Sequence, residues 1–247
     1  MVIAVAGKGG TGKSTVASLI VRHLVQRGAT PVLAVDADPN STLEDKLGLQ
    51  VARTIGGLRE DALQQRHDLP AGTPKQRAVE YEIQQAIAEG AGFDLVVMGR
   101  GEGPGCYCSL NNMVRTFLQQ LASGYRHVVV DNEAGMEHLS RRTNNKVDLM
   151  LVVCDRTPIG LKTACRIAEV AKELDVVQGR MGLVINRGPE DCAAEDDAAA
   201  AGLELLGCVP EDRLVQEFEL QSRALLDLPA ESAAAAAVSG MLQRVGL

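Results

Sequence analysis

Residues 7–15, GKGGTGKST, limit what this chain can fold into more than any other stretch. They fit the pattern G-x-x-x-x-G-K-[ST], in which small residues let backbone N–H groups surround phosphate oxygens, while the lysine and hydroxyl meet phosphate and Mg²⁺. β-Branched residues come before this run and apolar residues at helical spacing follow it, as a strand and a helix require. A glycine turn that binds nothing is the competing interpretation. We predict a nucleoside triphosphate site made by Gly9, Gly10, Thr11, Gly12, Lys13, Ser14 and Thr15, with Ser14 also at the magnesium.

Carboxylates follow two of the predicted strands. A buried strand over residues 31–35 leads into Asp36 and Asp38, and another over residues 127–130 leads into Asp131. In an open parallel sheet, ligands bind at the carboxyl ends of the strands. We therefore expect Asp36 and Asp38 to approach Mg²⁺ and the attacking water, and Asp131 to hold the magnesium through water. Surface turns are the alternative at both places, because these segments contain turn-forming residues.

Strand patterns alternate with helix patterns about seven times along the chain. This alternation predicts an α/β fold with a doubly wound, mainly parallel sheet flanked by helices. We expect one domain over residues 1–247, with an inserted helical region at 42–92 and a loose, glycine-rich loop at 99–110. The other expected strands cover 94–98, 147–153, 181–185 and 205–209, and the expected helices cover 111–122, 160–174 and 231–245.

Composition limits the expected cellular location and binding partners of the protein. A formal net charge of −7 provides no basic field for a phosphate backbone, so nucleic acid is not an expected partner. Apolar runs stay below the ~18 residues of a membrane span, so we expect a cytoplasmic protein without a membrane partner. In that compartment the 6 cysteines favour core packing, metal binding or redox chemistry over a disulfide framework.

Cys106 and Cys108 form a C-x-C pair directly after the glycine-rich run 99–105. Two thiols two residues apart can point the same way from an extended segment and ligate one metal ion, but they supply only half a tetrahedron. His138 and Cys154 are candidates to complete it, or a two-fold axis brings the same pair from a second subunit, which we favour. Simple burial of both cysteines is the alternative.

Lys8 extends the phosphate pattern to K-G-G-x-G-K-[ST], which resembles the deviant-Walker ATPases, the class of MinD, ParA and the nitrogenase iron protein. The resemblance implies that Lys8 reaches the nucleotide of a partner subunit, as an arginine finger does. It also implies that Asp38 positions the hydrolytic water, with Asp36 nearer the magnesium. The residues it places around the adenine are Asn186, Arg187, Pro210 and Glu211, although Asn186 is equally suited to capping a helix.

A narrower resemblance rests on the same lysine, on Asp36 and Asp38, and on the C-x-C pair about 70 residues later. These features are similar to the CooC-type accessory ATPases that mature nickel-containing carbon monoxide dehydrogenase. The resemblance implies a homodimer with nickel or zinc held by Cys106 and Cys108 of both subunits, and carbon monoxide dehydrogenase as its client.

Two other functions stay open at this point. One is an iron-sulfur carrier or electron-transfer ATPase with a cluster at the dimer interface. Ala134 stands where cluster-carrying iron proteins have a second cysteine, which disfavours a cluster of their type. The other is a positioning or regulatory ATPase in which the cysteines are incidental.

Overall fold

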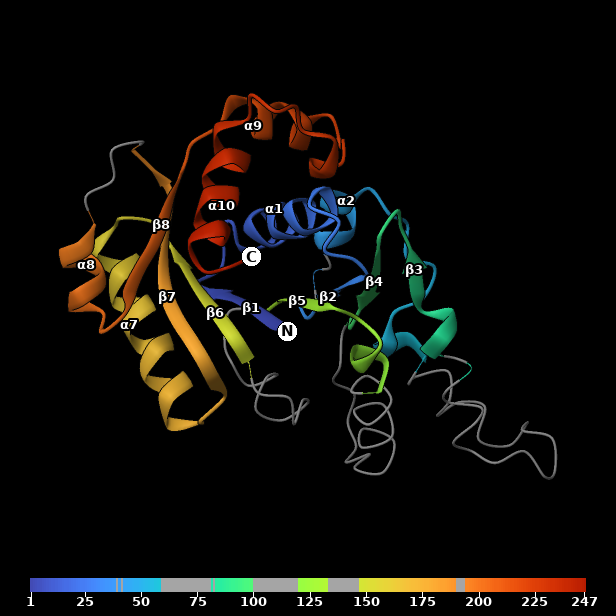
Figure 1. Cartoon of the computed structure of the whole chain (residues 1–247), viewed down its shortest axis with the longest axis horizontal. Helices are drawn as coiled ribbons and strands as arrows, with labels where there is room; N and C mark the ends of the chain where they lie inside the picture. The colour runs from blue at the N-terminus through green and yellow to red at the C-terminus, as the bar shows by residue number, and fades with distance from the viewer. Residues whose placement is uncertain are drawn as a thin grey trace.

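An eight-stranded sheet forms the centre of the molecule in the computed structural model, which describes residues 1–38, 40, 42–58, 81, 83–99, 120–132, 147–189 and 194–247 (Figure 1). The strand order is β3-β4-β2-β5-β1-β6-β7-β8, and every neighbouring pair is parallel except β3 with β4. The predicted mainly parallel α/β sheet is therefore confirmed. The strands are β1 Val2–Gly7, β2 Val32–Asp36, β3 Ile87–Glu89, β4 Phe93–Val97, β5 His127–Asp131, β6 Val147–Cys154, β7 Val177–Gly188 and β8 Glu204–Pro210.

Helices cover both faces of this sheet (Figure 1). One face carries α1 Lys13–Gln26, α2 Leu43–Leu47, α9 Arg213–Leu220, the 3₁₀ turn η1 Leu225–Asp227 and α10 Ala233–Arg244. The other carries α7 Pro158–Glu173 and α8 Glu195–Ala200, and further helical turns lie at 55–58, 83–85 and 120–123. The helices expected at 160–174 and 231–245 are thus present as α7 and α10, while most of the one expected at 111–122 lies outside the described residues.

Strand β1 shows why both faces are closed. Its side chains alternate, so that Ile3 and Val5 pack under α1, and Ala4 and Ala6 pack under α7. A parallel strand buried on both faces reads as a continuous apolar run, which is what residues 2–6 show.

β1 also marks the place where the strand order reverses. β5 lies on one side of it and β6 on the other, and the chain leaves β1 into α1. Open α/β sheets bind ligands at such a switch point, beyond the carboxyl ends of the strands. The fold therefore places residues 7–15 at the position where a ligand site is expected.

The region predicted as a helical insertion, 42–92, contains a strand where it is described. Ile87–Glu89 form β3, an antiparallel edge strand on β4, and Leu43, Leu47 and Ile83 are buried in the core. The sequence pattern did not reveal β3 because so short a run carries no periodicity, and the strand forms by pairing with β4.

Cys208 on β8 takes part in a disulfide. Composition favours thiols without a disulfide framework, so this cysteine departs from that expectation. Cys154 and Cys165 are free.

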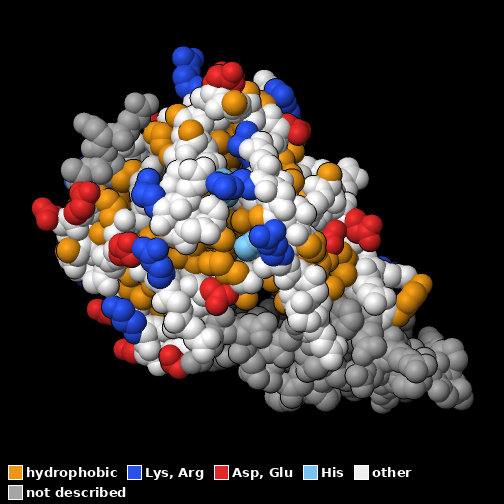
Figure 2. Space-filling view, in the orientation of Figure 1, with side chains coloured by type: hydrophobic (Ala, Val, Ile, Leu, Met, Phe, Trp, Pro, Cys, Tyr) orange, Lys and Arg blue, Asp and Glu red, His pale blue; other side chains and the backbone are white. Residues whose placement is uncertain are grey.

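The surface of the molecule is of mixed character. On the face shown in Figure 2, lysine and arginine side chains are scattered among acidic and apolar ones. Among the described residues, no helix combines the length and apolar character needed to cross a bilayer.

Candidate functional site

A cavity of about 530 Å³ lies at the carboxyl ends of the central strands, beside the start of α1. Such a volume is within the range of small-molecule and cofactor sites. Its described lining consists of Gly9, Gly10, Gly12, Lys13, Ser14, Thr15, Asp38, Asn40, Thr42, Asp45, Lys46, Arg187, Glu219, Ser222 and Arg223. Most of the predicted phosphate-binding residues therefore face one cavity.

The loop between β1 and α1 is closed by bonds to a single carbonyl. The Lys8 carbonyl accepts hydrogen bonds from the Thr11 hydroxyl at 2.8 Å and from Lys13 Nζ at 3.4 Å. Gly12, the residue before α1, has a φ of 86° in the left-handed region, which glycine adopts without strain. This geometry directs the first N–H groups and the positive dipole end of α1 toward the cavity, as an anion site requires.

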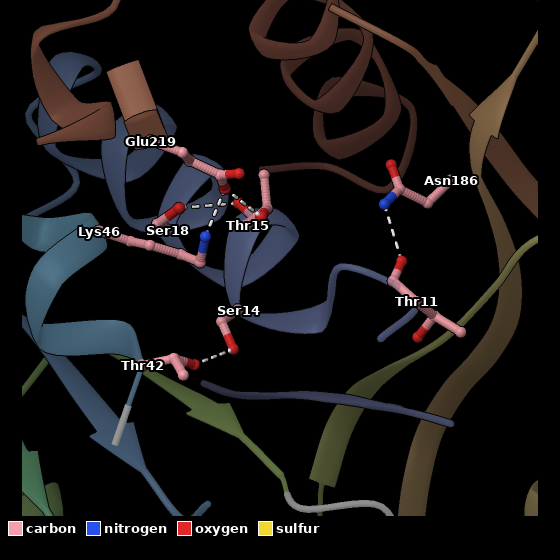
Figure 3. A network of polar contacts seen from close by, with 8 residues as sticks. All are labelled: Thr11, Ser14, Thr15, Ser18, Thr42, Lys46, Asn186 and Glu219. Atoms are coloured by element: carbon pink, nitrogen blue, oxygen red, sulfur yellow. Dashed lines mark hydrogen bonds and ion pairs between the residues drawn. The ribbon is translucent and has the colours of Figure 1, made fainter. Parts of the chain in front are cut away.

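Asn186 holds the same loop from the end of β7. Its Nδ2 donates a hydrogen bond to the Thr11 carbonyl at 2.7 Å, and the residue is 6% exposed (Figure 3). A Cβ at Gly12 would lie 2.2 Å from this nitrogen, so only glycine fits there. Asn186 thus supports the phosphate loop. Neither of the roles predicted for it, contact with the adenine and capping of a helix, includes this hydrogen bond.

Asp36 organises the segment that carries Asp38. Its two carboxylate oxygens accept hydrogen bonds from the backbone N–H of Asp38 at 3.0 Å and of Leu43 at 2.9 Å. The second bond caps the start of α2. Burial raises the pKa of Asp36 and these two bonds oppose the rise. Asp38 itself lines the cavity and accepts hydrogen bonds from Asn40.

Asp131 pairs in register with Asp36 on the neighbouring strand. It is fully buried, and neither carboxylate oxygen has a hydrogen-bond partner among the described residues. Burial raises the pKa of Asp131 to about 7, and the nearby Ser14 hydroxyl and the Lys13 charge oppose that rise. An unpartnered buried carboxylate beside a hydroxyl and a second carboxylate suits Mg²⁺, which uses one or two carboxylates together with substrate phosphates. These residues therefore fit the ion that the phosphate pattern implies.

Two hydroxyls at the start of α1 make contacts that the sequence did not reveal. Ser14 Oγ lies 2.8 Å from Thr42 Oγ1, and Thr15 Oγ1 donates to Glu219 Oε1 at 2.9 Å (Figure 3). Lys46 forms an ion pair with the same Glu219 oxygen. Burial alone would raise the pKa of Glu219, but the hydrogen bond and charge of Lys46 bring it below its usual range. Glu219 lies 204 residues from Thr15 along the chain, and no local pattern could connect them.

The remaining predicted residues lie in different places. Arg187 lines the cavity with a positive φ of 56°. Lys8 is exposed and is not part of the described lining of the cavity. Pro210 ends β8, and Glu211 accepts a hydrogen bond from Gln216 at 2.7 Å. Neither of these two contacts the cavity in the described part of the chain.

The predicted metal ligands Cys106 and Cys108 lie outside the described residues, as does His138. Cys154 is described, and it is buried at the end of β6 with burial raising its pKa to about 12. Within the described ranges, no group of three or more His, Cys, Asp and Glu side chains could hold a metal ion.

A parallel sheet with a phosphate loop at its switch point, a braced glycine turn and paired acidic strand ends defines a P-loop nucleotide-binding protein. Residues 2–225 match the CobQ/CobB/MinD/ParA nucleotide-binding domain, and the chain belongs to this family. It is accordingly an ATP-binding ATPase of the MinD/ParA type.

Two curated relatives cover nearly the whole chain. An uncharacterised ATP-binding protein of Methanocaldococcus jannaschii is 42% identical over 233 residues, which are 93% of this chain and 92% of that protein. The carbon monoxide dehydrogenase accessory protein CooC of Rhodospirillum rubrum is 31% identical over 261 aligned positions, covering 100% of this chain and 98% of that protein.

Solved structures agree on the fold. The MinD cell division protein of Aquifex aeolicus superposes with a TM-score of 0.71 at 19% identity, over 99% of this chain and 95% of its own. A ParA family ATPase of Chlorobium tepidum gives 0.72 at 19% identity, over 100% and 99%. At such identities these matches establish the fold and carry no statement about substrates or partners.

Proposed function

We propose that this protein is an ATP-dependent metallochaperone that forms a homodimer on nucleotide binding and helps insert nickel into carbon monoxide dehydrogenase. The observation that carries the proposal is the end-to-end similarity to the CooC accessory protein, at 31% identity. The C-x-C pair at Cys106 and Cys108 supports it, because two thiolates from each of two subunits make a four-sulfur site.

The residues around the cavity have distinct roles in this proposal. Lys13 and the N–H groups of Gly9 to Thr15 bind the phosphates, and Asp38 orients the attacking water. Ser14, Asp36 and Asp131 would hold Mg²⁺, whose charge neutralises the phosphate oxygens. Asn186 keeps the loop in shape, and Arg187 contacts the nucleotide. Pro210 and Glu211, which do not line the described cavity, are assigned to the base by the resemblance to the deviant-Walker ATPases.

Lys8 has its proposed role in the other subunit. Its side chain is exposed and does not line the cavity of its own subunit in the described part of the chain. A cation placed there can stabilise charge on the partner's transferred phosphoryl group. The nucleotide would then act as a bridge, and the dimer it stabilises would bring the two C-x-C pairs together.

The cargo metal is a substrate of this cycle, and its binding should depend on the nucleotide. We would measure bound nickel and zinc by elemental analysis and the mass in solution by light scattering, each with and without ATP and Mg²⁺. The proposal expects a dimer with ATP and one metal ion per dimer, in line with a closed four-thiolate site.

Variants separate the proposal from its competitors. The double change Cys106→Ser and Cys108→Ser should remove the metal, whereas Cys165→Ser, a half-buried free cysteine on α7, should retain it. Unchanged metal content in the double variant would reject the role of the pair. A brown protein after anaerobic purification would indicate an iron-sulfur carrier instead. Full activity of the double cysteine variant would indicate a positioning or regulatory ATPase.

The client requires its own test. Carbon monoxide dehydrogenase made without nickel should gain activity faster when the loaded protein and ATP are added than with free nickel at the same concentration. Equal rates of activation would contradict the proposed client while leaving the metal site intact.

A further inference from the structure

The hydroxyls of Ser14 and Thr15 contact two other elements. Ser14 Oγ lies 2.8 Å from Thr42 Oγ1, in the segment that leads into α2. Thr15 Oγ1 donates to Glu219 Oε1 on α9 at 2.9 Å (Figure 3). A bound magnesium would compete for the Ser14 hydroxyl, because the phosphate pattern uses that hydroxyl as a ligand.

Lys46 and Glu219 join these two elements directly. Lys46 on α2 pairs with the Glu219 oxygen that Thr15 also contacts, so one carboxylate connects α1, α2 and α9. The side chains are 19% and 37% exposed, respectively. Both residues line the cavity, and they are 173 residues apart in sequence. The pair therefore joins two distant parts of the chain at the cavity.

The charges around the pair make it sensitive to an anionic ligand. Glu219 is a carboxylate in a cavity that receives polyphosphate, so its charge and the ligand's repel each other. Arg187 and Arg223 line the same cavity, and the Arg223 guanidinium lies 3.8 Å from the Phe218 ring centroid.

We propose that Lys46 and Glu219 form a gate that ties α2 to α9 across the cavity and separates when nucleotide enters or leaves. The pair thereby sets the rate of nucleotide exchange. Because α2 follows the segment of Asp38, opening the gate also frees that segment to rearrange around the phosphates. The inference requires only the nucleotide site and holds whether or not a metal is carried.

Exchange kinetics test the gate. We would follow association and release of N-methylanthraniloyl-ADP by stopped-flow fluorescence in Lys46→Met, Glu219→Gln and the double variant. An exposed ion pair is worth enough to change a rate roughly two- to fivefold. Each single change should therefore raise both rate constants by that factor, and the double variant should match the single ones, since all three remove the same contact.

Matched controls keep the result specific. Lys162→Met on α7 and Glu217→Gln on α9 remove the same charges from exposed positions that do not line the described cavity and should leave both rates unchanged. Lys46→Arg retains the ion pair and should keep wild-type exchange. Thermal unfolding of every variant verifies the fold. If either the Lys46 or the Glu219 variant does not fold, the exchange rates of the other still test the gate.

Three outcomes would overturn the gate. Opposite effects, with Lys46→Met slowing association and Glu219→Gln speeding it, would show that the two residues act only through their charges. Faster release with unchanged association in Glu219→Gln alone would make Glu219 a direct nucleotide contact. Unchanged exchange in all variants would show that the pair has no part in it.

Discussion

Asn186 Nδ2 lies 2.7 Å from the Thr11 carbonyl oxygen, and this hydrogen bond ties the end of β7 to the phosphate loop. The two residues are 175 positions apart, and the bond is buried. A residue at the edge of the nucleotide site thus supports the loop that binds the phosphates. Asn186 therefore has a structural task that is separate from contact with the base.

Asn186→Ala should weaken nucleotide binding by roughly 5- to 20-fold, because a lost buried hydrogen bond leaves the Thr11 carbonyl without its donor. Titration calorimetry with ATP and with inorganic tripolyphosphate distinguishes the two possible roles. A brace lowers both affinities alike, whereas a base contact lowers only that for ATP. Gln243→Ala on the exposed side of α10 should change neither.

Gly12→Ala should abolish nucleotide binding. The new Cβ would lie 2.2 Å from Asn186 Nδ2. In addition, the backbone φ of +86° at position 12 is strained for any residue with a side chain. Gly240→Ala in α10 is the matched control, because its Cβ would meet only Arg244 at 3.9 Å. That change should preserve binding and stabilise the fold by about 0.5–1 kcal/mol through helix propensity. Retained binding in Gly12→Ala would show that the loop tolerates a shift of Asn186.

Lys13→Ala and Lys8→Ala should behave differently. Lys13 lines the cavity and is 6% exposed, so its loss should weaken ADP binding at least about tenfold. Lys8→Ala should bind ADP normally but lose ATP-dependent dimerisation and hydrolysis. Calorimetry and light scattering measure the two properties, and equal loss of binding in both variants would exclude action across the interface.

Asp38→Asn should bind ATP, hydrolyse it slowly and accumulate as a dimer. The amide preserves size but cannot accept a proton or orient water as the carboxylate does. Size-exclusion chromatography after incubation with ATP would detect the trapped dimer, with Asp227→Asn in η1 as a control that turns over normally. A monomer with normal turnover would remove Asp38 from the mechanism.

His23 should make the fold less stable in mild acid. Burial lowers the pKa of His23, aided by the charges of Arg27 and Arg22 and opposed by the backbone of Leu247. As the pH falls below the unfolded pKa of about 6.5, the unfolded chain takes up a proton that the folded chain resists, so the free energy of unfolding decreases.

Urea denaturation at pH 7.5 and 5.5 measures this contribution. One such proton changes the free energy of unfolding by at most about 1.4 kcal/mol per pH unit. His23→Gln should show a shallower loss between the two pH values than the wild type, and Gln26→Ala, on the exposed side of α1, should show the same loss as the wild type. An identical loss in His23→Gln would assign the acid sensitivity to other groups.

The sequence predicted the fold well because its main signals are local. Most strand cores are short apolar runs, and the phosphate loop is a contiguous pattern between a strand and a helix. β3 has no such signal, because it forms by pairing with β4. Residues 42–92 were predicted to be an inserted helical region because the segment is charged and helical in pattern, although Leu43 and Leu47 belong to the core.

The site was predicted in part. Most of residues 9–15 and Asp38 face the cavity, since their positions follow from the chain direction at the strand ends. Lys46 and Glu219 were missed because their contact exists only once α2 and α9 meet. Asn186 was singled out, but its partner Thr11 lies in the phosphate loop, and only the folded chain shows that bond.

The packing of α1 has a consequence for synthesis on the ribosome. Arg22 in α1 donates to the Leu228 carbonyl, 206 residues later, and Leu24 shares a core with Val238 and Leu242 of α10. Helix α1, which follows the phosphate loop, is therefore translated early but is covered by α10 only late. We expect the emerging chain to expose the apolar face of α1 until α10 has left the ribosome.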